Sequence, residues 1–323
     1  MLHPSVPAVI LAPMEGVTDA PMRAWQGAAG GFTFAVSEFL RVSQVALTKR
    51  NFYRDVPELL AGARTPTGLP VQVQLLGGDA GRMAASAFAA CEAGATAIDI
   101  NFGCPAPTVN RHDGGATLLK HPARIREIVS AVRAAVPKHI PVSAKMRLGW
   151  DTIHAIDENA VMAAEGGAAW LTIHGRTRAA CYAPPVFWRP IGRVRERLGI
   201  PVVANGDIWT VEDFRRCQDE TGCLHYMLGR GALADPLLPH RIAAELGLAP
   251  APPDSPAGPF DWLPSLRGLV KWADHFGHRA GTVSRLKRWL NLAQSRGRFA
   301  HFDAVKRAET VDELLAGVAA NGQ

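Results

Sequence analysis

Eight short apolar segments, most of them rich in β-branched residues, recur through the first three quarters of the chain and alternate with alanine-rich helical stretches. The apolar segments are AVILAPM from Ala8, FTFAVSEF from Phe32, VQVQLLG from Val71, AIDINFG from Ala97, PVSAKMR from Pro141, WLTIHGR from Trp170, PVVANGD from Pro201 and LHYMLGR from Leu224. Clear helical stretches are 82–93, 123–136, 153–165 and 211–219. Alternation of this kind predicts parallel strands joined by crossover helices. Eight units in about 230 residues fit a closed (β/α)₈ barrel better than an open doubly wound sheet, and no GxGxxG motif follows the first segment.

A change of composition divides the chain after the last of these units. Residues 249–259 read APAPPDSPAGP, in which proline and small residues exclude a helix or a central strand. We therefore expect a barrel domain over 1–248, a linker over 249–259 and a second domain over 260–323. The second domain shows helical spacing alone, which predicts a bundle of three or four helices. Its two predicted apolar stripes are Leu266, Leu269, Val270 and Ala273, and Leu286, Trp289, Leu290 and Ala293.

Positive charge is concentrated in this second domain. The whole chain carries a formal net charge of +6, yet the window 266–298 alone holds eight basic residues and one acidic residue, a local +7 that leaves −1 elsewhere. The basic residues are Arg267, Lys271, Arg279, Arg285, Lys287, Arg288, Arg296 and Arg298. Such asymmetry indicates a surface that binds a polyanion. The alternative is an ordinary solvated helix face.

Several classes of protein are excluded by what the sequence lacks. The N-terminus has no cationic leader followed by a long apolar run, and no segment reaches the roughly 18 apolar residues of a membrane span. We expect a cytoplasmic protein without a membrane partner. Five cysteines without C-x-x-C spacing argue against a disulfide framework and against a zinc site, so no metal is expected.

Polar residues follow nearly every predicted strand. In a barrel, catalytic groups gather at the carboxyl ends of the strands, so convergence of these residues indicates a ligand that touches most of the ring. Taken alone, a polar residue at a strand end is as often a loop-capping residue as a functional one. The residues at these exits are Pro13, Met14 and Glu15; Glu38 and Arg41; Gln74; Asn101 and Cys104; Lys145 and Arg147; His174 and Arg176; Asn205, Gly206 and Asp207; and Gly229 and Arg230.

Two of these side chains carry the sharpest chemical signal. Lys145 lies within an apolar strand, where its ammonium group needs an anionic partner. A reduced flavin is one candidate, and a structural ion pair with Asp99 or Asp151 is the other. Cys104 begins a long glycine-rich loop, which suggests a role beyond packing. A thiol of ordinary pKa donates a proton at neutral pH, whereas a nucleophile needs a lowered pKa, and the sequence leaves both roles open.

The last two strand exits predict a phosphate site. NGDI at Asn205 and LGRGAL at Leu228 place glycines where backbone amides can approach an anion, beside the cationic Arg230. Barrels commonly build a phosphate site after their seventh and eighth strands. A phosphorylated cofactor and a phosphorylated sugar satisfy this signal equally well.

Seven ordered segments resemble the tRNA-dihydrouridine synthases over nearly the whole chain. They are APMEGVTD at Ala12, VQLLGG at Val73, INFGCPAPTVNRHDGGATLLK at Ile100, SAKMRLGWD at Ser143, IHGRTR at Ile173, VVANGDIW at Val202 and LGRGAL at Leu228. More narrowly, APMEGV, SEFLRV, GGATLLK, RLGWD and SRLKRWL are similar to the bacterial synthase C branch, which modifies the D-loop uridine at tRNA position 16.

The resemblance implies a role for individual residues. FMN contacts are implied for Pro13, Met14, Glu15, Gln74, Lys145 and His174, and contacts to its ribityl phosphate for Asn205, Gly206, Asp207, Gly229 and Arg230. Cys104 matches the proton donor of the family, and Asn101 and Tyr182 match positions that contact the substrate nucleotide or its neighbours. Arg41, Arg285 and Lys287 match residues that orient tRNA. Leu292 stands where the branch has an aromatic tRNA contact, which makes the position specificity less secure than the chemistry.

The implied activity is reduction of a uridine in tRNA to dihydrouridine, with FMN as cofactor, NADPH (or NADH) as reductant and the protein acting as a monomer. Two rival functions remain. A related FMN barrel dehydrogenase acting on a free pyrimidine or on dihydroorotate would share the phosphate site and the thiol, but it has no use for the basic helical domain. A non-catalytic RNA-binding or scaffold protein predicts neither flavin nor turnover.

Overall fold

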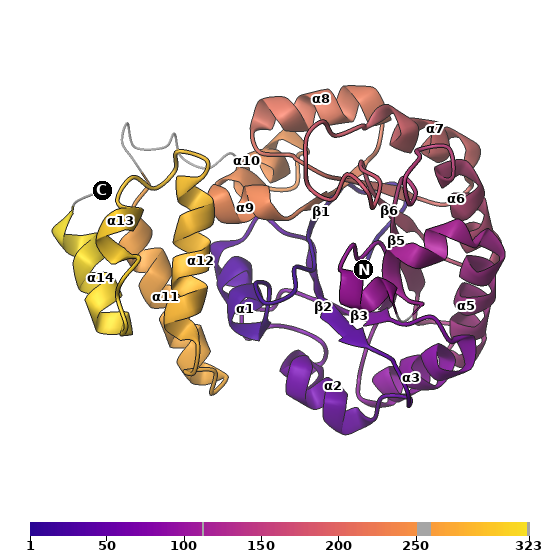
Figure 1. Ribbon diagram of the computed structural model, residues 1–323, viewed down its shortest axis with the longest axis horizontal. Helices are drawn as coiled ribbons and strands as arrows, with labels where there is room; N and C mark the ends of the chain where they lie inside the picture. The colour runs from indigo at the N-terminus through magenta and orange to yellow at the C-terminus, as the bar shows by residue number, and fades with distance from the viewer. Residues whose placement is uncertain (112, 251–259, 322–323) are drawn as a thin grey trace.

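Eight parallel strands close into a single barrel, as the alternation of segments predicts, with helices around the outside (Figure 1). The computed structural model describes residues 1–111, 113–250 and 260–321. Most of the expected linker, 251–259, lies outside the described residues. The strands are β1 (Ala8–Leu11), β2 (Phe34–Arg41), β3 (Val71–Leu76), β4 (Ile98–Phe102), β5 (Val142–Arg147), β6 (Leu171–His174), β7 (Val202–Asn205) and β8 (His225–Leu228). Each strand pairs with the next along the chain, and β8 pairs with β1.

Helices cross between the strands and shield them from solvent. Local sequence fixes several of their starts, because Thr210 caps α8 through a reciprocal bond with Asp213, and proline stands in the first turn of α1, α5 and α7. The helices of the barrel are α1 (Ala20–Ala29), α2 (Lys49–Asp55), α3 (Ala80–Glu92), α4 (Pro107–Asn110), α5 (Pro122–Ala135), α6 (Ile156–Glu165), α7 (Arg189–Arg197), α8 (Val211–Thr221), α9 (Arg230–Ala234) and α10 (Leu238–Glu245), with 3₁₀ helices η1 (Pro57–Ala61) and η2 (Gly115–Lys120).

Strand register brings the polar strand ends together at one end of the barrel. Asn101 lies opposite Lys145, Arg147 opposite His174, and His174 opposite Asn205. Because all eight strands are parallel, their carboxyl ends form one ring, and the loops that follow them surround a common mouth. Side chains of four neighbouring strands that are distant in sequence thus become neighbours in space.

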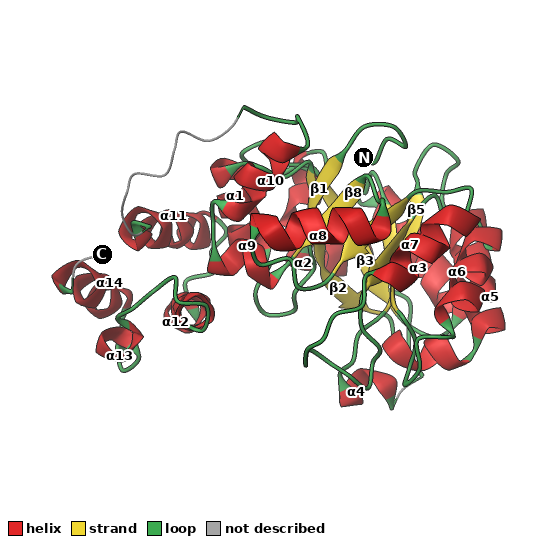
Figure 2. Cartoon of the chain, turned by 90° about the horizontal axis from the view of Figure 1, so that it is seen from above, coloured by secondary structure: helices red, strands yellow, loops and turns green. Residues whose placement is uncertain are grey.

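The C-terminal segment folds into helices alone. These are α11 (Trp262–His275), α12 (Thr282–Gln294), the short α13 (Phe302–Val305) and α14 (Val311–Ala320). Seven of the eight stripe residues belong to one core cluster or pack against it, and the eighth, Ala273, is buried; Val270 is half-buried. Figure 2 shows these helices on one side of the barrel, next to α1 and α9.

Three tryptophans hold the helical domain against the barrel. The Trp289 ring of α12 meets the Trp25 ring of α1 edge-on at 4.6 Å and the Trp262 ring of α11 at 5.4 Å. Its indole N–H donates to the carbonyl of Leu233 in α9 at 2.8 Å. Arg285 adds an ion pair to Asp19, the N-cap residue of α1, at 2.5 Å. Apolar packing and directed polar contacts together hold the C-terminal helices in a fixed orientation on the barrel.

Two further findings bear on the expectations from composition. No helix in the part of the chain that the structure describes is long and apolar enough to cross a membrane. All five cysteines are free thiols.

Candidate active site

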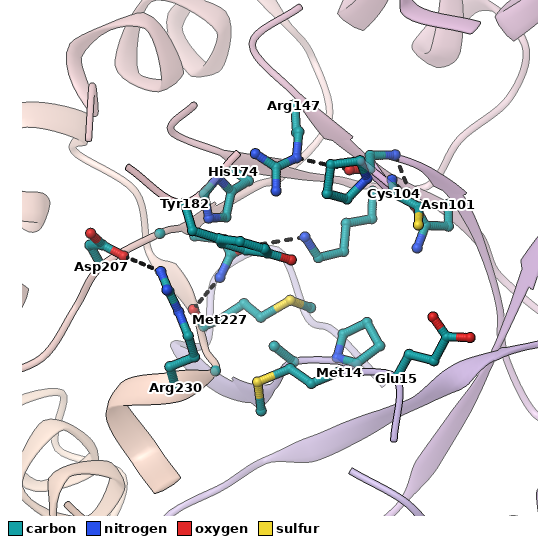
Figure 3. A pocket seen from close by; sticks show the side chains of 18 of the residues that line it. Met14, Glu15, Asn101, Cys104, Arg147, His174, Tyr182, Asp207, Met227 and Arg230 are labelled. Atoms are coloured by element: carbon teal, nitrogen blue, oxygen red, sulfur yellow. Dashed lines mark hydrogen bonds and ion pairs between the residues drawn. The ribbon is translucent and has the colours of Figure 1, made fainter. Parts of the chain in front are cut away.

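A cavity of about 600 Å³ opens at the carboxyl ends of the strands (Figure 3). This volume lies within the range of small-molecule and cofactor sites. Its wall contains thirteen of the eighteen residues for which the family resemblance implies a role: Pro13, Met14, Glu15, Asn101, Cys104, Lys145, His174, Tyr182, Asn205, Gly206, Asp207, Gly229 and Arg230. Five others lie elsewhere: Gln74, Arg41, Arg285, Lys287 and Leu292.

The loop after β1 forms one wall of the cavity and is held from two sides. The hydroxyl of Thr18 accepts a hydrogen bond from the amide of Met14 at 2.7 Å. The carboxylate of Glu38 accepts from the amide of Val17 at 2.9 Å, and a register shift in β2 lies next to it, between Val36 and Phe39. These bonds give the segment from Pro13 to Glu15 a fixed conformation against the cavity.

Lys145 carries a charge that the surrounding protein does not neutralise. Its ammonium donates to the side-chain oxygen of Asn205 at 3.1 Å, and among the described residues no carboxylate lies within 4.0 Å of it. Burial, together with the nearby Arg147, lowers the pKa of Lys145 to about 8. Neither of the structural ion pairs considered above, with Asp99 or with Asp151, forms. The position is suited to the negative charge of a ligand.

Asp99 is satisfied by other side chains. Its two oxygens accept from the amide of Gln74 at 2.6 Å and from the hydroxyl of Ser143 at 2.5 Å. Burial raises the pKa of Asp99. The carbonyl oxygen of Gln74 in turn accepts from Asn101 at 2.9 Å. Gln74 is therefore bonded at both ends of its amide beneath the cavity, which fixes the orientation of the amide.

Cys104 lies at the cavity wall with its thiol protonated. The residue is 9% exposed, and the side chain of Asn101 accepts from the amides of Gly103 and Cys104, which fixes the turn that carries the thiol. Burial raises the pKa of Cys104 above its ordinary value. A thiol with a raised pKa stays protonated at neutral pH, so burial of this thiol favours a proton donor over a nucleophile.

Arg147, the last residue of β5, connects the loops that follow β4 and β6. Its guanidinium donates to the carbonyls of Gly103 at 2.8 Å, Thr177 at 3.0 Å and Cys181 at 2.7 Å. It thereby holds the residue before Cys104 and the residue before Tyr182 at fixed places. Arg147 was identified as a strand-end residue without a role. Its partners are backbone carbonyls of distant loops, which cannot be predicted from residue types.

The opposite end of the cavity is cationic. Asp207 forms ion pairs with the buried Arg176 and with Arg230, the latter at 2.7 Å, and these pairs lower its pKa although burial opposes them. Two cations thus share one carboxylate. Gly206 has a φ of +121°, and a Cβ there would lie 3.3 Å from the amide nitrogen of Gly175. The backbone can approach a ligand closely at this end.

Trp209 is a residue of this end that sequence reasoning missed. The guanidinium carbon of Arg296, from the helical domain, lies 3.5 Å from the centroid of the Trp209 ring, and that of Arg230 lies 5.1 Å from it. The tryptophan directly follows the NGDI segment, and that adjacency is the signal that could have found it.

His174 and Tyr182 lie between Cys104 and the cationic end of the cavity (Figure 3). Burial and four neighbouring cations hold the pKa of His174 well below its usual range, so the ring is neutral. Its Nδ1 has no hydrogen-bond partner among the described residues. Tyr182 is half-exposed, meets His174 edge-on, and lies 4.6 Å from the guanidinium carbon of Arg230. An aromatic ligand in the cavity would touch both rings.

The remaining residues expected to contact tRNA lie outside the cavity. Arg41 is exposed at the end of β2 and donates to the carbonyl of Thr108 at 3.2 Å. The charge of Arg285 is compensated by Asp19, and Lys287 is half-buried on α12. Leu292 packs against the core of the helical domain. No group of three or more metal-binding side chains occurs among the described residues.

Comparison with known proteins gives a consistent picture. Residues 10–257 match the model of the dihydrouridine synthase (Dus) family. The chain is 44% identical to the tRNA-dihydrouridine(16) synthase of Pseudomonas putida, over 88% of this chain and 87% of that protein. It is 42% identical to the protein of the same name from Ralstonia nicotianae, over 95% and 94%. An old yellow enzyme homologue from Zymomonas mobilis shares the fold with a TM-score of 0.50 and 16% identity, over 77% of this chain and 90% of that one.

Proposed function

The chain belongs to the dihydrouridine synthase family, and we propose that it reduces the C5=C6 bond of a uridine in tRNA, with FMN as cofactor and NADPH as electron source. The observation that carries this proposal is a single cavity lined by the thiol of Cys104 and by the ammonium of Lys145, which forms no ion pair with a described carboxylate. The names of the relatives favour position 16 as the target.

The residues present fit an FMN. Nη1 of the buried Arg176 and Nδ1 of His174 lack partners among the described residues, and Gly206 permits close approach of the backbone. We assign the phosphate to the cationic end at Asn205, Gly206, Asp207, Gly229 and Arg230, and the ring system to Pro13, Met14, Glu15, Lys145 and His174, with Gln74 beneath. A flavin bound there supplies the hydride that adds to C6 of the uracil.

The residues of the chain supply the proton and the positioning. Cys104 donates its proton to C5 of the uracil, and the resulting thiolate takes up a proton from solvent. Lys145 would stabilise negative charge on a bound flavin. Asn101 and Tyr182 contact the nucleotide, while Arg147 keeps the loops of Cys104 and Tyr182 at a constant separation. The basic helical domain contacts phosphates and positions the tRNA without reading its bases.

A direct assay separates this function from its nearest rival. Purified protein is expected to be yellow, and with NADPH it should form dihydrouridine in unmodified tRNA while leaving free uridine and dihydroorotate unchanged. Mass spectrometry of digested tRNA detects the product, and sequencing locates it, with position 16 expected. Turnover of the free base at a rate equal to that of tRNA would favour the free-pyrimidine dehydrogenase instead.

The pKa of Lys145 predicts how cofactor binding depends on pH. The ammonium is charged below about pH 8 and neutral above it, so the dissociation constant for FMN should rise as the pH passes upward through about 8. Quenching of flavin fluorescence at a series of pH values measures this. Lys145→Met should bind FMN more weakly and without that pH dependence. An identical profile in both proteins would remove Lys145 from the cofactor site.

A further inference from the structure

Three segments that the sequence analysis singled out meet at one point on the rim of the mouth. GGATLLK ends in Lys120, RLGWD contains Trp150, and IHGRTR ends in Arg178. The ammonium of Lys120 lies 3.9 Å from the centroid of the Trp150 ring, and the guanidinium carbon of Arg178 lies 4.5 Å from it. None of the three residues lines the cavity, so the site described above makes no use of them. We refer to them as the Trp150 cluster.

Backbone hydrogen bonds build the Trp150 cluster. The amide of Arg178 donates to the carbonyl of Gly149 at 2.8 Å, and the amide of Ala179 donates to the carbonyl of Trp150 at 2.7 Å. Lys120 is the last residue of η2, which follows the loop of Cys104. The loops after β4, β5 and β6 are thus joined, and the two cations have defined positions.

The positive charges of the two cations of the Trp150 cluster are not compensated by a nearby carboxylate. Among the described residues, no carboxylate lies within 4.0 Å of the side-chain nitrogens of Lys120 or Arg178. An indole face attracts a cation through its quadrupole and leaves the net charge in place. Arg285 differs, because Asp19 compensates its charge. Lys120 is exposed, and Arg178 and Trp150 are half-buried. The cluster therefore presents two fixed positive charges to whatever approaches the mouth.

The Trp150 cluster lies across the mouth from the helical domain. That domain packs on α1 and α9, which adjoin β1 and β8, whereas the cluster belongs to the loops after β4, β5 and β6. In a closed barrel of eight strands, β5 is opposite β1, and Figure 1 shows α5 and α6 on the side away from α11 and α12. Positive charge thus flanks the cavity on both sides.

We propose that Lys120 and Arg178, held against Trp150, bind backbone phosphates of the RNA on the far rim of the mouth, so that the substrate is gripped on both sides of the cavity. This inference rests on the proposed function. Arginine and lysine side chains are the groups that most often contact phosphate, and such contacts set the position of the RNA without reading its sequence. Phosphates of the nicotinamide dinucleotide offer the same chemistry, so the experiment must distinguish the two sources.

The test is the double variant Lys120→Gln/Arg178→Gln in the full-length, flavin-loaded protein. We expect the Kd for unmodified tRNA to rise about tenfold at physiological salt, and the slope of log Kd against log salt concentration to fall by between about 1 and 2. The KM for NADPH, measured in the absence of tRNA, should be the same as that of the unaltered protein. The charge-preserving variant Lys120→Arg/Arg178→Lys should restore most of the affinity, which separates lost charge from a disturbed loop.

The matched control is Lys138→Gln/Arg193→Gln, which removes the same charge from exposed positions outside the mouth loops, between α5 and β5 and on α7. If Lys120→Gln/Arg178→Gln and this control show the same Kd and the same salt slope, the phosphate contact of the Trp150 cluster is overturned. The proposed function then still stands, provided that the unaltered protein forms dihydrouridine. A raised KM for NADPH with unchanged tRNA binding would overturn the RNA contact in favour of the dinucleotide. An unaltered protein that forms no dihydrouridine would instead overturn the proposed function, and this inference with it.

Discussion

Replacing Cys104 by alanine is expected to lower the rate of dihydrouridine formation by about 10²- to 10⁴-fold, the usual contribution of a positioned general acid. The thiol lies at the cavity wall, and burial raises its pKa, so it holds its proton at neutral pH. Alanine removes that proton and little volume. Oxidation of NADPH should continue, because nothing in the position of Cys104 assigns it to that half of the reaction.

A single-turnover experiment measures the effect most directly. The flavin-loaded protein is reduced with limiting NADPH, mixed with unmodified tRNA, and assayed for dihydrouridine by mass spectrometry. Cys91→Ala is the control, since Cys91 is a half-buried thiol on α3, outside the cavity. Undiminished product in Cys104→Ala would show that the proton comes from another group, such as a water molecule or Glu15.

Replacing Trp289 by alanine is expected to lower the free energy of unfolding of the helical domain by about 3–5 kcal/mol. The ring is 2% exposed and packs between Trp25 and Trp262. Its loss leaves a cavity at the interface and also leaves the carbonyl of Leu233 without the bond that it accepts from the indole. Because the domain then docks poorly, tRNA affinity should fall while the barrel keeps its flavin.

Urea denaturation followed by circular dichroism tests this prediction. The variant should show an early transition for the helical domain, separated from that of the barrel. Phe88→Ala removes an aromatic ring that is 50% exposed on α3, so it should change the free energy of unfolding by less than about 0.5 kcal/mol. A single transition with an unchanged midpoint in Trp289→Ala would mean that the tryptophan cluster does not hold the domains together.

The sequence predicted the barrel because its signals are local. Each strand is a short apolar run, and each helix carries its own start and end residues, so eight repeats were enough to identify the architecture. The candidate site was predictable to the same degree where residues sit directly at strand ends. Lys145 and Asn205 are such residues, because parallel register brings every strand end to the same ring.

What the sequence could not predict depends on side chains that meet from distant loops. Arg147 is one example, because its guanidinium donates to carbonyls in the loops after β4 and β6. The ion pair of Arg285 is a second example, because its partner Asp19 lies 266 residues earlier in the chain. The charges of one segment can be counted from the sequence, but the sequence does not show which of them form ion pairs with residues elsewhere in the fold.

The ring of Trp209 lies where the cavity of the barrel meets the C-terminal helices. Arg230 touches it from the barrel, and Arg296 touches it from the helical domain. A ligand at Arg230 and a nucleic acid at Arg296 would therefore both adjoin the same aromatic ring. If binding of one changes the affinity for the other, thermodynamic reciprocity requires an equal change in the reverse direction.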